Sequence, residues 1–526
     1  MRTIERLTSL GLLAWFCCLS AEPVQGGKVL VMPVDGSHWL SMKILVKELS
    51  LRGHEVVVLV PESSLLIQGS DTYRTEVFTV SYSQQELDGN FNELRKGIFN
   101  PPALTGFLVN VQRLLNFTDL QVRGCESLLH NEALMSRLRA EGFDVLLTDP
   151  FLPCGPILAH LFSVPAVYFL HGLPCGLHIK VNQCPSPPSH VPVFSSGLSP
   201  KMNFVQRVKN LFLYFKEEHT CKLMYANFDH LASRYFGDGV TYKDLLSHDA
   251  IWLLKYDWTF EWPRPIMPNM VFIGGINCAQ KGRLPADLEE FVDGSGDDGF
   301  IVFTLGSMVS DMPEERAKQF FDAFRQIPQR VLWRYTGAPP PDVPENVRLM
   351  KWLPQNDLLA HPKAKIFLTH GGSHGLYEGI CNAVPMVMFP LFGDQEENTH
   401  RMVARGVAEK LSVHDVTTEA LLTAIKKIIH DKSYKQKMVQ LSQIHLDRPL
   451  QPLDLAVFWT EFVMKHKGAA HLRVAAHDLN WIQYHSLDVL GFLALVLITV
   501  LVLTLKCCWF CTRSCFRKRT EKRKSQ

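Results

Sequence analysis

Residues 365–379 read KIFLTHGGSHGLYEG, in which an apolar segment runs into a glycine-rich turn and then into a helical pattern. We predict a buried strand over Ile366–Thr369 and a helix that opens at the turn His370-Gly371-Gly372. The N–H groups at a helix N-terminus are unpaired and carry a partial positive charge, so this turn suits a diphosphate. The glycines allow the backbone to approach the phosphates closely, and His370 can donate a further hydrogen bond. A tight connection without a ligand would have a similar pattern, so the interpretation depends on the neighbouring residues.

Those neighbours favour a nucleotide. Glu378 falls about two turns into the predicted helix, where its carboxylate can accept both hydroxyls of a ribose. Trp352 offers a flat face on which a uracil ring can stack, and Gln355 supplies a nearby amide. The loop that ends at Ser307 follows the predicted strand Phe300–Thr304 and can add N–H donors for the phosphates.

The chain around this segment has two halves, each of which alternates β-branched strands with amphipathic helices. The predicted strands are Val29–Met32, Glu55–Val60, Asp144–Thr148, Ala166–Leu170 and Met270–Gly274, then Phe300–Thr304, Val331–Tyr335, Lys365–Thr369 and Met386–Phe389. This alternation predicts parallel sheets covered on both faces. The fold class is therefore α/β, with two doubly wound domains that place ligands at the carboxyl ends of their strands. Residues 280–299 are the predicted hinge between the halves.

Both ends of the chain carry targeting patterns. Arg2 and Arg6 precede the apolar stretch Leu7–Leu19, so residues 1–25 are predicted to be a secretory signal peptide, with a buried first helix as the alternative. Val489–Leu505 is an uncharged apolar run of a length near the short limit for a membrane span. A strongly basic tail follows, so the positive-inside rule predicts a type I protein whose residues from about 25 to 485 are luminal.

The last five residues, KRKSQ, resemble a dilysine retrieval signal and favour the endoplasmic reticulum membrane, although an ordinary basic flank would look similar. Seven cysteines lie in the predicted luminal part, and their connectivity cannot be deduced from their spacing. No metal-ligand spacing is present. Asn116 begins a glycosylation sequon, Asn116-Phe117-Thr118. The net charge of +2 argues against a nucleic-acid partner.

These features together resemble those of a known enzyme family. The segment Trp352–Gln395 resembles the donor-binding signature of UDP-glycosyltransferases. The segments Trp333–Gly337, Lys351–Leu358 and His485–Asp488 resemble vertebrate UDP-glucuronosyltransferases, nearest the branch that conjugates bilirubin and phenols. The resemblance extends over essentially the whole chain. It implies a GT-B fold, two Rossmann-like domains with the nucleotide in the second, and inversion at the anomeric carbon without a metal or cofactor.

The resemblance also implies roles for individual residues. Trp352 stacks on uracil, Gln355 and Glu378 hold the ribose, and Asp394 and Gln395 contact sugar hydroxyls. The diphosphate is held by Ser307, His370, Gly371, Gly372 and, as a further candidate, His374, which stands where some members of the family have Asn. Lys255 stands where family members carry Arg; we expect it to contact the glucuronate carboxylate, although a lysine lacks the bidentate fork of arginine.

The catalytic base is expected in the first half. His38 follows the first predicted strand at the entry to a helix, and a histidine suits proton removal from a phenol or alcohol near neutral pH. Asp149 follows the strand Asp144–Thr148 and can orient and stabilise the imidazolium. The alternative for Asp149 is an Asx turn before Pro150.

The predicted organisation is a signal peptide (1–25), an acceptor-binding domain (26–284), a UDP-sugar-binding domain (285–450), helices leading to the membrane (451–486), a transmembrane helix (487–507) and a basic cytosolic tail (508–526). The expected activity is transfer of glucuronic acid from UDP-glucuronate to hydroxyl, amine or carboxyl groups of small hydrophobic acceptors. We expect the acceptor pocket to use loops in Phe91–Val111 and Cys175–Pro192. The lipid bilayer and homo- or hetero-oligomers are further expected partners. Two alternatives remain open: a UDP-glucose or UDP-N-acetylglucosamine transferase on the same scaffold, and a non-catalytic membrane-bound partner protein.

Overall fold

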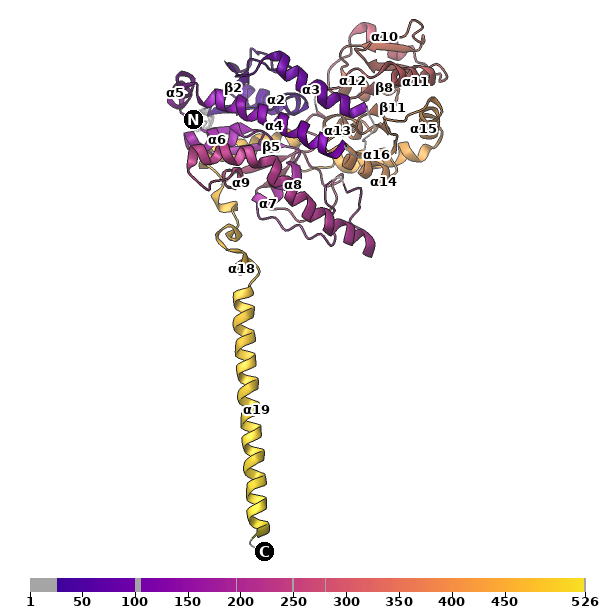
Figure 1. Ribbon diagram of the computed structural model, residues 1–526. Helices are drawn as coiled ribbons and strands as arrows, with labels where there is room; N and C mark the ends of the chain where they lie inside the picture. The colour runs from indigo at the N-terminus through magenta and orange to yellow at the C-terminus, as the bar shows by residue number, and fades with distance from the viewer. Residues whose placement is uncertain (1–25, 100–105, 195, 248–249, 280, 525–526) are drawn as a thin grey trace, which may run out of the picture. The chain divides into compact units, whose positions relative to one another are not determined.

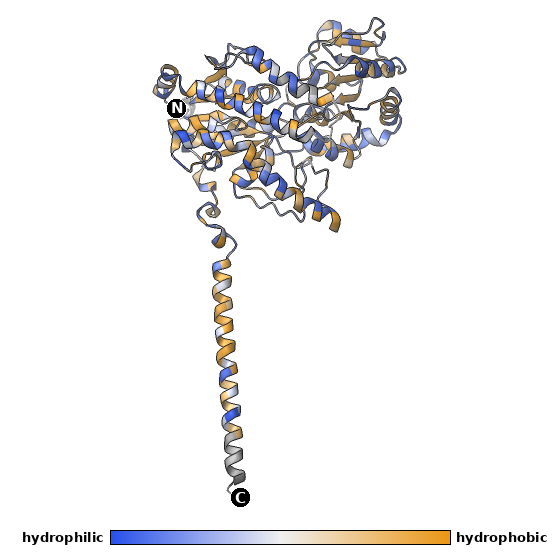
Figure 2. Cartoon of the chain, viewed as in Figure 1, coloured by the Kyte–Doolittle hydropathy of each residue, from blue (hydrophilic) through white to orange (hydrophobic). Residues whose placement is uncertain are grey.

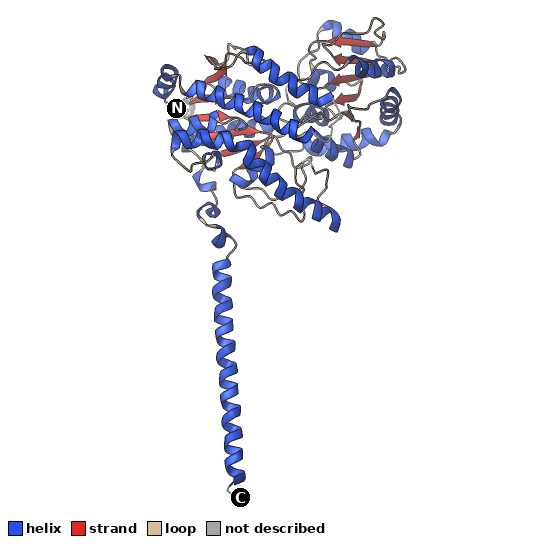
Figure 3. Cartoon of the chain, in the orientation of Figure 1, coloured by secondary structure: helices blue, strands red, loops and turns tan. Residues whose placement is uncertain are grey.

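The computed structural model describes residues 26–99, 106–194, 196–247, 250–279 and 281–524 (Figure 1). The predicted signal peptide lies outside the described residues. The contacts within the chain divide it into two units, the first ending at Leu472 and the second starting at Arg473. The first unit contains two sheets, and in each half helices flank the strands (Figure 3).

The first sheet has seven parallel strands in the order β3-β2-β1-β4-β5-β6-β7. Their bounds are β1 (Lys28–Met32), β2 (Glu55–Pro61), β3 (Arg74–Phe78), β4 (Val145–Thr148), β5 (Ala166–Leu170), β6 (Ile251–Leu254) and β7 (Met270–Phe272). Successive strands are added on one side of β1 and then, from β4 onward, on the other. The strand order therefore reverses between β1 and β4, where ligands bind in doubly wound sheets.

The helices of this half are α2 (Ser37–Leu51), α3 (Gln84–Phe99), α4 (Gly106–Leu129), α5 (Glu132–Glu141), α6 (Cys154–Phe162), α7 (Leu177–Val181), α8 (Phe204–Phe236) and α9 (Tyr242–Leu246). Side chains of β1 alternate between two cores. Leu30 and Met32 belong to one, and Val29 and Val31 belong to the other. Because both faces of the sheet are buried, its central strands are continuous apolar runs.

The second sheet has six parallel strands in the order β10-β9-β8-β11-β12-β13. Their bounds are β8 (Phe300–Thr304), β9 (Arg330–Arg334), β10 (Val347–Met350), β11 (Ala364–Thr369), β12 (Met386–Met388) and β13 (Ala408–Lys410). The helices are α10 (Ala286–Asp293), α11 (Glu314–Phe324), α12 (Gln355–Ala360), α13 (Ser373–Cys381), α14 (Gln395–Ala404), α15 (Thr418–His430) and α16 (Lys432–Leu446). The predicted α/β fold with two Rossmann-like sheets is confirmed.

The predicted strands are confirmed with ends that differ by no more than two residues, but four strands were missed. Three of these, β3, β10 and β13, lie at sheet edges and contain charged residues such as Arg74, Arg348 and Lys410. Edge strands lack the continuous apolar pattern of strands that are buried on both faces. The fourth, β6, is a buried run of only four residues, which periodicity alone cannot identify.

The predicted hinge, residues 280–299, is not an open linker throughout. It contains α10, whose Leu288 and Val292 are buried in the core of the second half together with Phe300 and Val302 of β8. The chain has therefore joined the second half by the start of α10.

A helix after the second sheet returns to the first half. The helix α17 (Pro452–His466) buries Ala456, Val457 and Val463 in the core that contains Val29 and Trp39. The sequence predicted helices leading to the membrane in this region (451–486), but not the packing of α17 on the first half. By this packing the chain crosses between the halves a second time.

Three disulfides lie in the first unit: Cys125–Cys154, Cys175–Cys221 and Cys278–Cys381. Cys184 is unpaired and buried. The odd number of cysteines in this region is thus accounted for by one buried thiol.

The second unit contains the short helix α18 (Trp481–Tyr484) and the long helix α19 (Leu487–Lys524). Within the described residues, α19 is the one helix that is long and apolar enough to cross a membrane, over Leu487–Phe516. Its hydrophobic residues form a continuous stretch in Figure 2. The predicted C-terminal apolar helix is therefore confirmed, and its length and composition are consistent with a membrane anchor.

Candidate active site

A cavity of about 1140 Å³ lies between the two sheets and is lined by residues that follow strands of both halves. From the first half it receives His38, Asp149, His171 and Lys255. From the second half it receives Ser307, His370, Gly372, Asp394 and Gln395. Because parallel strands end at the same edge of a sheet, residues distant in sequence meet here.

Each of the four first-half residues lies just beyond the end of a strand of the first sheet. Asp149, His171 and Lys255 each come directly after a strand, namely β4, β5 and β6. His38 lies in the first turn of α2, after β1. The neighbouring strands β1, β4, β5 and β6 thus deliver four polar side chains to one side of the cavity.

His38 and Asp149 are in contact. Nδ1 of His38 lies 2.5 Å from Oδ2 of Asp149, whose side chain is 1% exposed, whereas the histidine side chain is 34% exposed. β1 and β4 pair directly, with Met32 opposite Thr148, so the two loops start side by side. Within the described part of the chain, Nε2 of His38 has no hydrogen-bond partner. The pair therefore has a buried carboxylate at one end and a ring nitrogen available to the cavity at the other.

The second carboxylate oxygen of Asp149 makes the turn that the sequence suggested as an alternative. Oδ1 accepts a hydrogen bond from the N–H of Phe151 at 3.0 Å. Both interpretations of Asp149 are therefore compatible, because one oxygen fixes the loop and the other holds the imidazole.

Lys255 is buried and crosses to the other half. Its Nζ donates a hydrogen bond to Oγ of Ser373 at 3.1 Å. Burial lowers the pKa of Lys255 to about 8, although the carboxylates of Asp394, Asp149 and Glu378 act in the opposite direction. The amine is thus charged at neutral pH and faces negative groups from both halves.

His171 was missed by the sequence analysis. Burial lowers its pKa to about 4, so the ring is neutral at pH 7. Its Nε2 lies 3.6 Å from Oδ2 of Asp394, and its buried Nδ1 has no hydrogen-bond partner within the described residues. Its place directly after β5, like that of Asp149 after β4, is the signal that could have identified it.

The predicted diphosphate turn is built around His370. Burial lowers the pKa of His370 to about 4, so this ring is also neutral at pH 7. A Cβ on Gly306 would lie 2.5 Å from His370 Nε2, and one on Gly372 would lie 2.4 Å away, so the ring requires glycine on both sides. Oγ of Ser307 is buried without a hydrogen-bond partner within the described residues, so it is free to donate to a ligand.

His374 connects the two halves. Its Nδ1 lies 2.8 Å from Oγ of Ser41 on α2, and its Nε2 lies 3.2 Å from Oε1 of Glu378. Its backbone carbonyl also accepts a hydrogen bond at 2.9 Å from Nδ2 of Asn277, which lies in the segment between β7 and α10. His374 therefore fixes the first turn of α13 against the first half, and it does not line the cavity.

The candidate nucleoside residues form a separate group on the second half. Nε2 of Gln355 donates a hydrogen bond to Oε2 of Glu378 at 2.5 Å, and Glu378 is buried. Trp352 is 50% exposed, and the guanidinium of Arg334 lies 5.2 Å from the centre of its ring. None of Trp352, Gln355 and Glu378 lines the cavity. Arg334 was missed by the sequence analysis and orders the indole on which a base is expected to stack.

Asp394 and Gln395 lie at the start of α14. Asp394 accepts a hydrogen bond from Nδ2 of Asn398 at 2.7 Å, and the same amide bonds the carbonyl oxygen of Gly371 at 3.0 Å. Oε1 of Gln395 accepts from the N–H groups of Leu391 and Phe392 at 2.8 and 3.0 Å. Gln395 thus shapes the loop through its oxygen and can serve a ligand only through its amide N–H groups.

Both segments that were predicted to form the acceptor pocket contribute to the cavity. The cavity receives Ile98 from Phe91–Val111, and Cys175, His178 and Val191 from Cys175–Pro192. Residues 100–105, within the first of these segments, lie outside the described residues. Asn116 is exposed on α4 and accepts a hydrogen bond from Gln112 at 2.9 Å.

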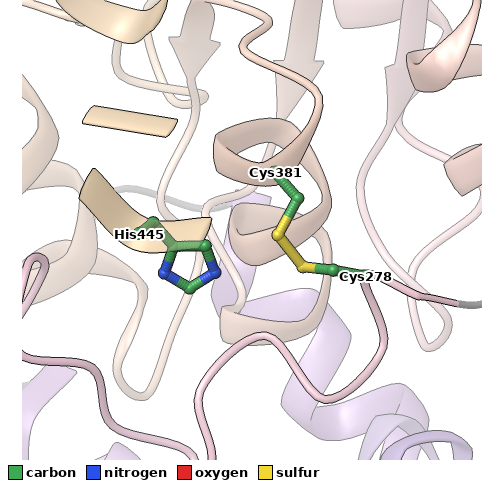
Figure 4. Close-up of side chains that lie close together, drawn as sticks. All are labelled: Cys278, Cys381 and His445. Carbon is green, nitrogen blue, oxygen red and sulfur yellow. A yellow bond between two sulfur atoms is a disulfide. The ribbon is translucent and has the colours of Figure 1, made fainter. Parts of the chain in front are cut away.

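Cys278, Cys381 and His445 bring their potential metal-ligand atoms within 4.8 Å of one another (Figure 4). The two cysteines are bonded to each other, so the thiolates that a metal would need are already used. His445 stacks on Tyr377, with ring centres 5.5 Å apart, and its Nδ1 lies 3.2 Å from Asp257. This cluster therefore joins the segment between β7 and α10, at Cys278, to α13 at Cys381 and to α16 at His445.

Comparisons with known proteins agree with this architecture. A family model described as UDP-glucoronosyl and UDP-glucosyl transferase matches residues 27–523. A UDP-glucuronosyltransferase of Pleuronectes platessa is 61% identical over 472 residues, which cover 89% of this chain and 100% of that protein. UDP-glucuronosyltransferase 1A1 of Rattus norvegicus is 49% identical over 510 residues, which cover 97% of this chain and 95% of that protein.

Solved structures agree in fold. A UDP-glucosyltransferase from Polygonum tinctorium superimposes with a TM-score of 0.57 at 17% identity, covering 84% of this chain and 98% of that one. The calicheamicin glycosyltransferase CalG4 has a TM-score of 0.54 at 17% identity, with coverage of 84% and 99%. The conclusion follows from the family match over most of the sequence. The two facing sheets and the cavity between their carboxyl ends agree with it. The chain belongs to the family of UDP-glucuronosyl and UDP-glucosyl transferases.

Proposed function

We propose that this chain is a UDP-glucuronosyltransferase that conjugates small lipophilic acceptors, with His38 as the general base. One observation carries this proposal. The His38–Asp149 pair of the first half lines the same cavity as Ser307, His370 and Asp394 of the second half. A base and an anion-binding turn that share one cavity are the requirements for attack of an acceptor on a nucleotide sugar.

The second half binds the donor. Backbone N–H groups at the start of α13 face the diphosphate, and Ser307 and His370 add side-chain donors. The neutral ring of His370 donates one hydrogen bond without adding charge. Trp352 stacks on the uracil, and Glu378 accepts hydrogen bonds from the ribose after exchanging its present contacts with Gln355 and His374 for them. His374 acts by holding this turn against α2.

The chemical step needs one base. Nε2 of His38 removes the acceptor proton as the acceptor oxygen attacks the anomeric carbon of the sugar. A carbon–oxygen bond forms to the acceptor, the bond from that carbon to the diphosphate oxygen breaks, and UDP leaves with the electron pair. A single displacement inverts the configuration at this carbon. The buried carboxylate of Asp149 stabilises the imidazolium that results.

Lys255 gives the donor site its selectivity. Its buried amine is charged at neutral pH, lines the cavity and interacts with the carboxylates of Asp149 and Asp394. A uronate carboxylate can pair with this amine, whereas the hydroxymethyl group of glucose or N-acetylglucosamine cannot supply a charge. This favours UDP-glucuronate over the two neutral donors. Asp394 and the amide N–H groups of Gln395 contact the sugar hydroxyls.

The acceptor side is apolar and has a link to the bilayer. On α8, residues 204, 208, 211 and 215 follow helical spacing and are all exposed and apolar, and Phe204 is 72% exposed. The opposite face of the same helix, at residues 213, 217, 220 and 224, lines the cavity. We infer that the outer face of α8 contacts lipid and that hydrophobic acceptors reach the cavity from the bilayer.

Location follows from the C-terminal anchor. The first unit lies in the lumen of the endoplasmic reticulum, the tail is cytosolic, and Asn116 is glycosylated. Protease added to sealed vesicles should remove only the tail after the span and leave the rest protected. Digestion of the large unit in intact vesicles would refute this topology.

The activity is tested by mass spectrometry of products from membranes that contain the full chain. UDP-glucuronate, UDP-glucose and UDP-N-acetylglucosamine are supplied in competition, together with a panel of phenols. We expect glucuronides to dominate. Mainly glucosides or N-acetylglucosaminides would establish the alternative donors, and no conjugate with any phenol would favour a non-catalytic partner protein.

A further inference from the structure

The cysteines of the two units differ in their bonding. Between residues 26 and 472, six of seven cysteines form disulfides. On α19, Cys507, Cys508, Cys511 and Cys515 are all unpaired and exposed. Disulfides form in oxidising compartments, and thiols persist in reducing ones. The contrast matches a chain whose tail lies on the cytosolic side of the membrane.

The four tail cysteines share one face of α19. At about 100° per residue, they fall within a sector of roughly 100° around the helix axis. The large side chains of this segment lie elsewhere: Trp509 and Phe516 fall at least ~80° outside that sector, and Phe510 falls about 60° outside it. The guanidinium of Arg513 packs over the Trp509 ring, 5.0 Å from its centre, on that other side. As far as Phe516, the aromatic side chains and Arg513 therefore lie outside the cysteine face.

Their depth along the helix also matters. The apolar run ends at Leu505, and a helix rises about 1.5 Å per residue. The four cysteines thus begin about 3 Å beyond the last apolar residue and end about 15 Å beyond it. This segment corresponds to the headgroup region and the adjacent aqueous layer of a bilayer. Thiols at this depth can react in the interface and leave an attached chain in the hydrocarbon.

We propose that Cys507, Cys508, Cys511 and Cys515 form an S-acylation site for long-chain fatty acyl groups. A cysteine thiolate attacks the thioester carbonyl of a fatty acyl-coenzyme A. The new sulfur–carbon bond forms, the bond from that carbon to the sulfur of coenzyme A breaks, and coenzyme A leaves as the thiolate, which takes up the proton lost by the cysteine. No oxidant or reductant is needed. This site rests on the cytosolic tail given under the proposed function.

Acylation has a physical consequence for this anchor. The apolar stretch is near the short limit for a membrane span, and a basic tail follows it. An acyl chain attached beside Lys506 enters the adjacent leaflet next to the span and holds the start of the tail at headgroup level. One acyl chain together with a polybasic segment is a combination that binds membranes stably.

The test uses the full chain in microsomes from cells that express it. Free thiols are blocked with N-ethylmaleimide, thioesters are cleaved with neutral hydroxylamine, and the released thiols are labelled with a mass-tagged maleimide. We expect hydroxylamine-dependent mass shifts of up to four tags. The shifts should disappear in the variant C507S/C508S/C511S/C515S and persist in C184S, which removes the buried luminal thiol, and in F510S on the other face of the helix.

The outcomes that overturn the proposal are specific. Absence of hydroxylamine-dependent shifts, their persistence in the quadruple variant, or shifts released by a reductant instead, which would indicate disulfides, would each refute it. Labelling of sealed microsomes with a membrane-impermeant maleimide separates the site from the topology. Tail thiols that react from outside without hydroxylamine would refute acylation but leave the topology intact. Tail thiols that react only after detergent would refute both.

Discussion

The two halves of the first unit supply their functional residues in different ways. In the second half, the candidate donor residues Trp352 to Gln395 come from one nearly continuous segment. In the first half, His38, Asp149, His171 and Lys255 come from four separate strand ends spread over more than two hundred residues. The proposed donor site is therefore encoded locally, whereas the proposed roles in proton transfer and sugar selectivity depend on the assembly of the whole first sheet.

The histidines of the cavity show the same division. Burial keeps His171 and His370 neutral at pH 7, with pKa values of about 4. His38 differs because its Nδ1 is in close contact with a buried carboxylate and its side chain is one-third exposed to the cavity. In the proposed mechanism, the neutral histidines bind and orient ligands, and the paired histidine transfers the proton.

The largest expected effect comes from the first half. His38→Ala should lower turnover by roughly 10²–10⁴, the usual contribution of a positioned base. UDP affinity should stay nearly unchanged, because His38 belongs to the acceptor side of the cavity. Turnover with a phenol and equilibrium titration with UDP provide the two readouts. Strongly weakened UDP binding would mean that the two halves do not have separate tasks.

Asp149→Asn should also slow turnover, and its effect should not add to that of His38→Ala, since the two residues act as one unit. The double variant should therefore resemble the His38→Ala single variant. Additive losses in the double-mutant cycle would show that Asp149 acts independently, for example only through its turn with Phe151.

An intermediate effect is expected in the second half. Glu378→Ala should weaken UDP binding by roughly 1–3 kcal/mol, because the ribose loses its acceptor and the contacts to Gln355 and His374 are also lost. Glu378→Gln preserves the size of the side chain and serves as the matched control, with a smaller loss expected. Isothermal titration with UDP measures both. Unchanged affinity in Glu378→Ala would show that the ribose binds elsewhere.

A smaller effect is expected in the pH dependence of donor binding, which Lys255 of the first half should control. Lys255 loses its charge as pH rises through its pKa of about 8, so affinity for UDP-glucuronate should fall by about tenfold between pH 7 and pH 9. Affinity for UDP, which lacks the carboxylate, should change much less. Lys255→Arg keeps its charge over this range and should flatten the profile. An equal pH dependence for UDP and UDP-glucuronate would remove Lys255 from sugar recognition.

The outer face of α8 is expected to have the mildest effect. Phe204→Ser with Phe215→Ser should raise KM several-fold for lipophilic acceptors in membranes and leave water-soluble phenols unaffected. Ile444→Ser on α16, which is similarly exposed, is the matched control. An equal rise for both classes of acceptor would mean that these side chains do not serve membrane access.

The sequence predicted most of the buried strands, though not β6, and it suggested the local donor segment, because both are short-range patterns. It identified Asp149 and His38 by their positions at strand ends, but it missed His171, which occupies the same kind of position after β5. The contacts of Lys255 with Ser373 and of His374 with Ser41 join residues more than one hundred positions apart. No periodic pattern encodes such pairs, because they arise only when the two sheets face each other. The disulfide pairing was open for the same reason.

The central claim is that His38 removes the acceptor proton, and acceptors of graded acidity test it most directly. The ratio of wild-type to His38→Ala turnover is measured over a series from simple alcohols to acidic phenols. The account predicts that this ratio is largest for alcohols and falls as the acceptor becomes more acidic, because an ionised acceptor needs no base. A ratio that does not depend on acceptor pKa, or an His38→Ala enzyme with normal turnover on alcohols, would contradict it.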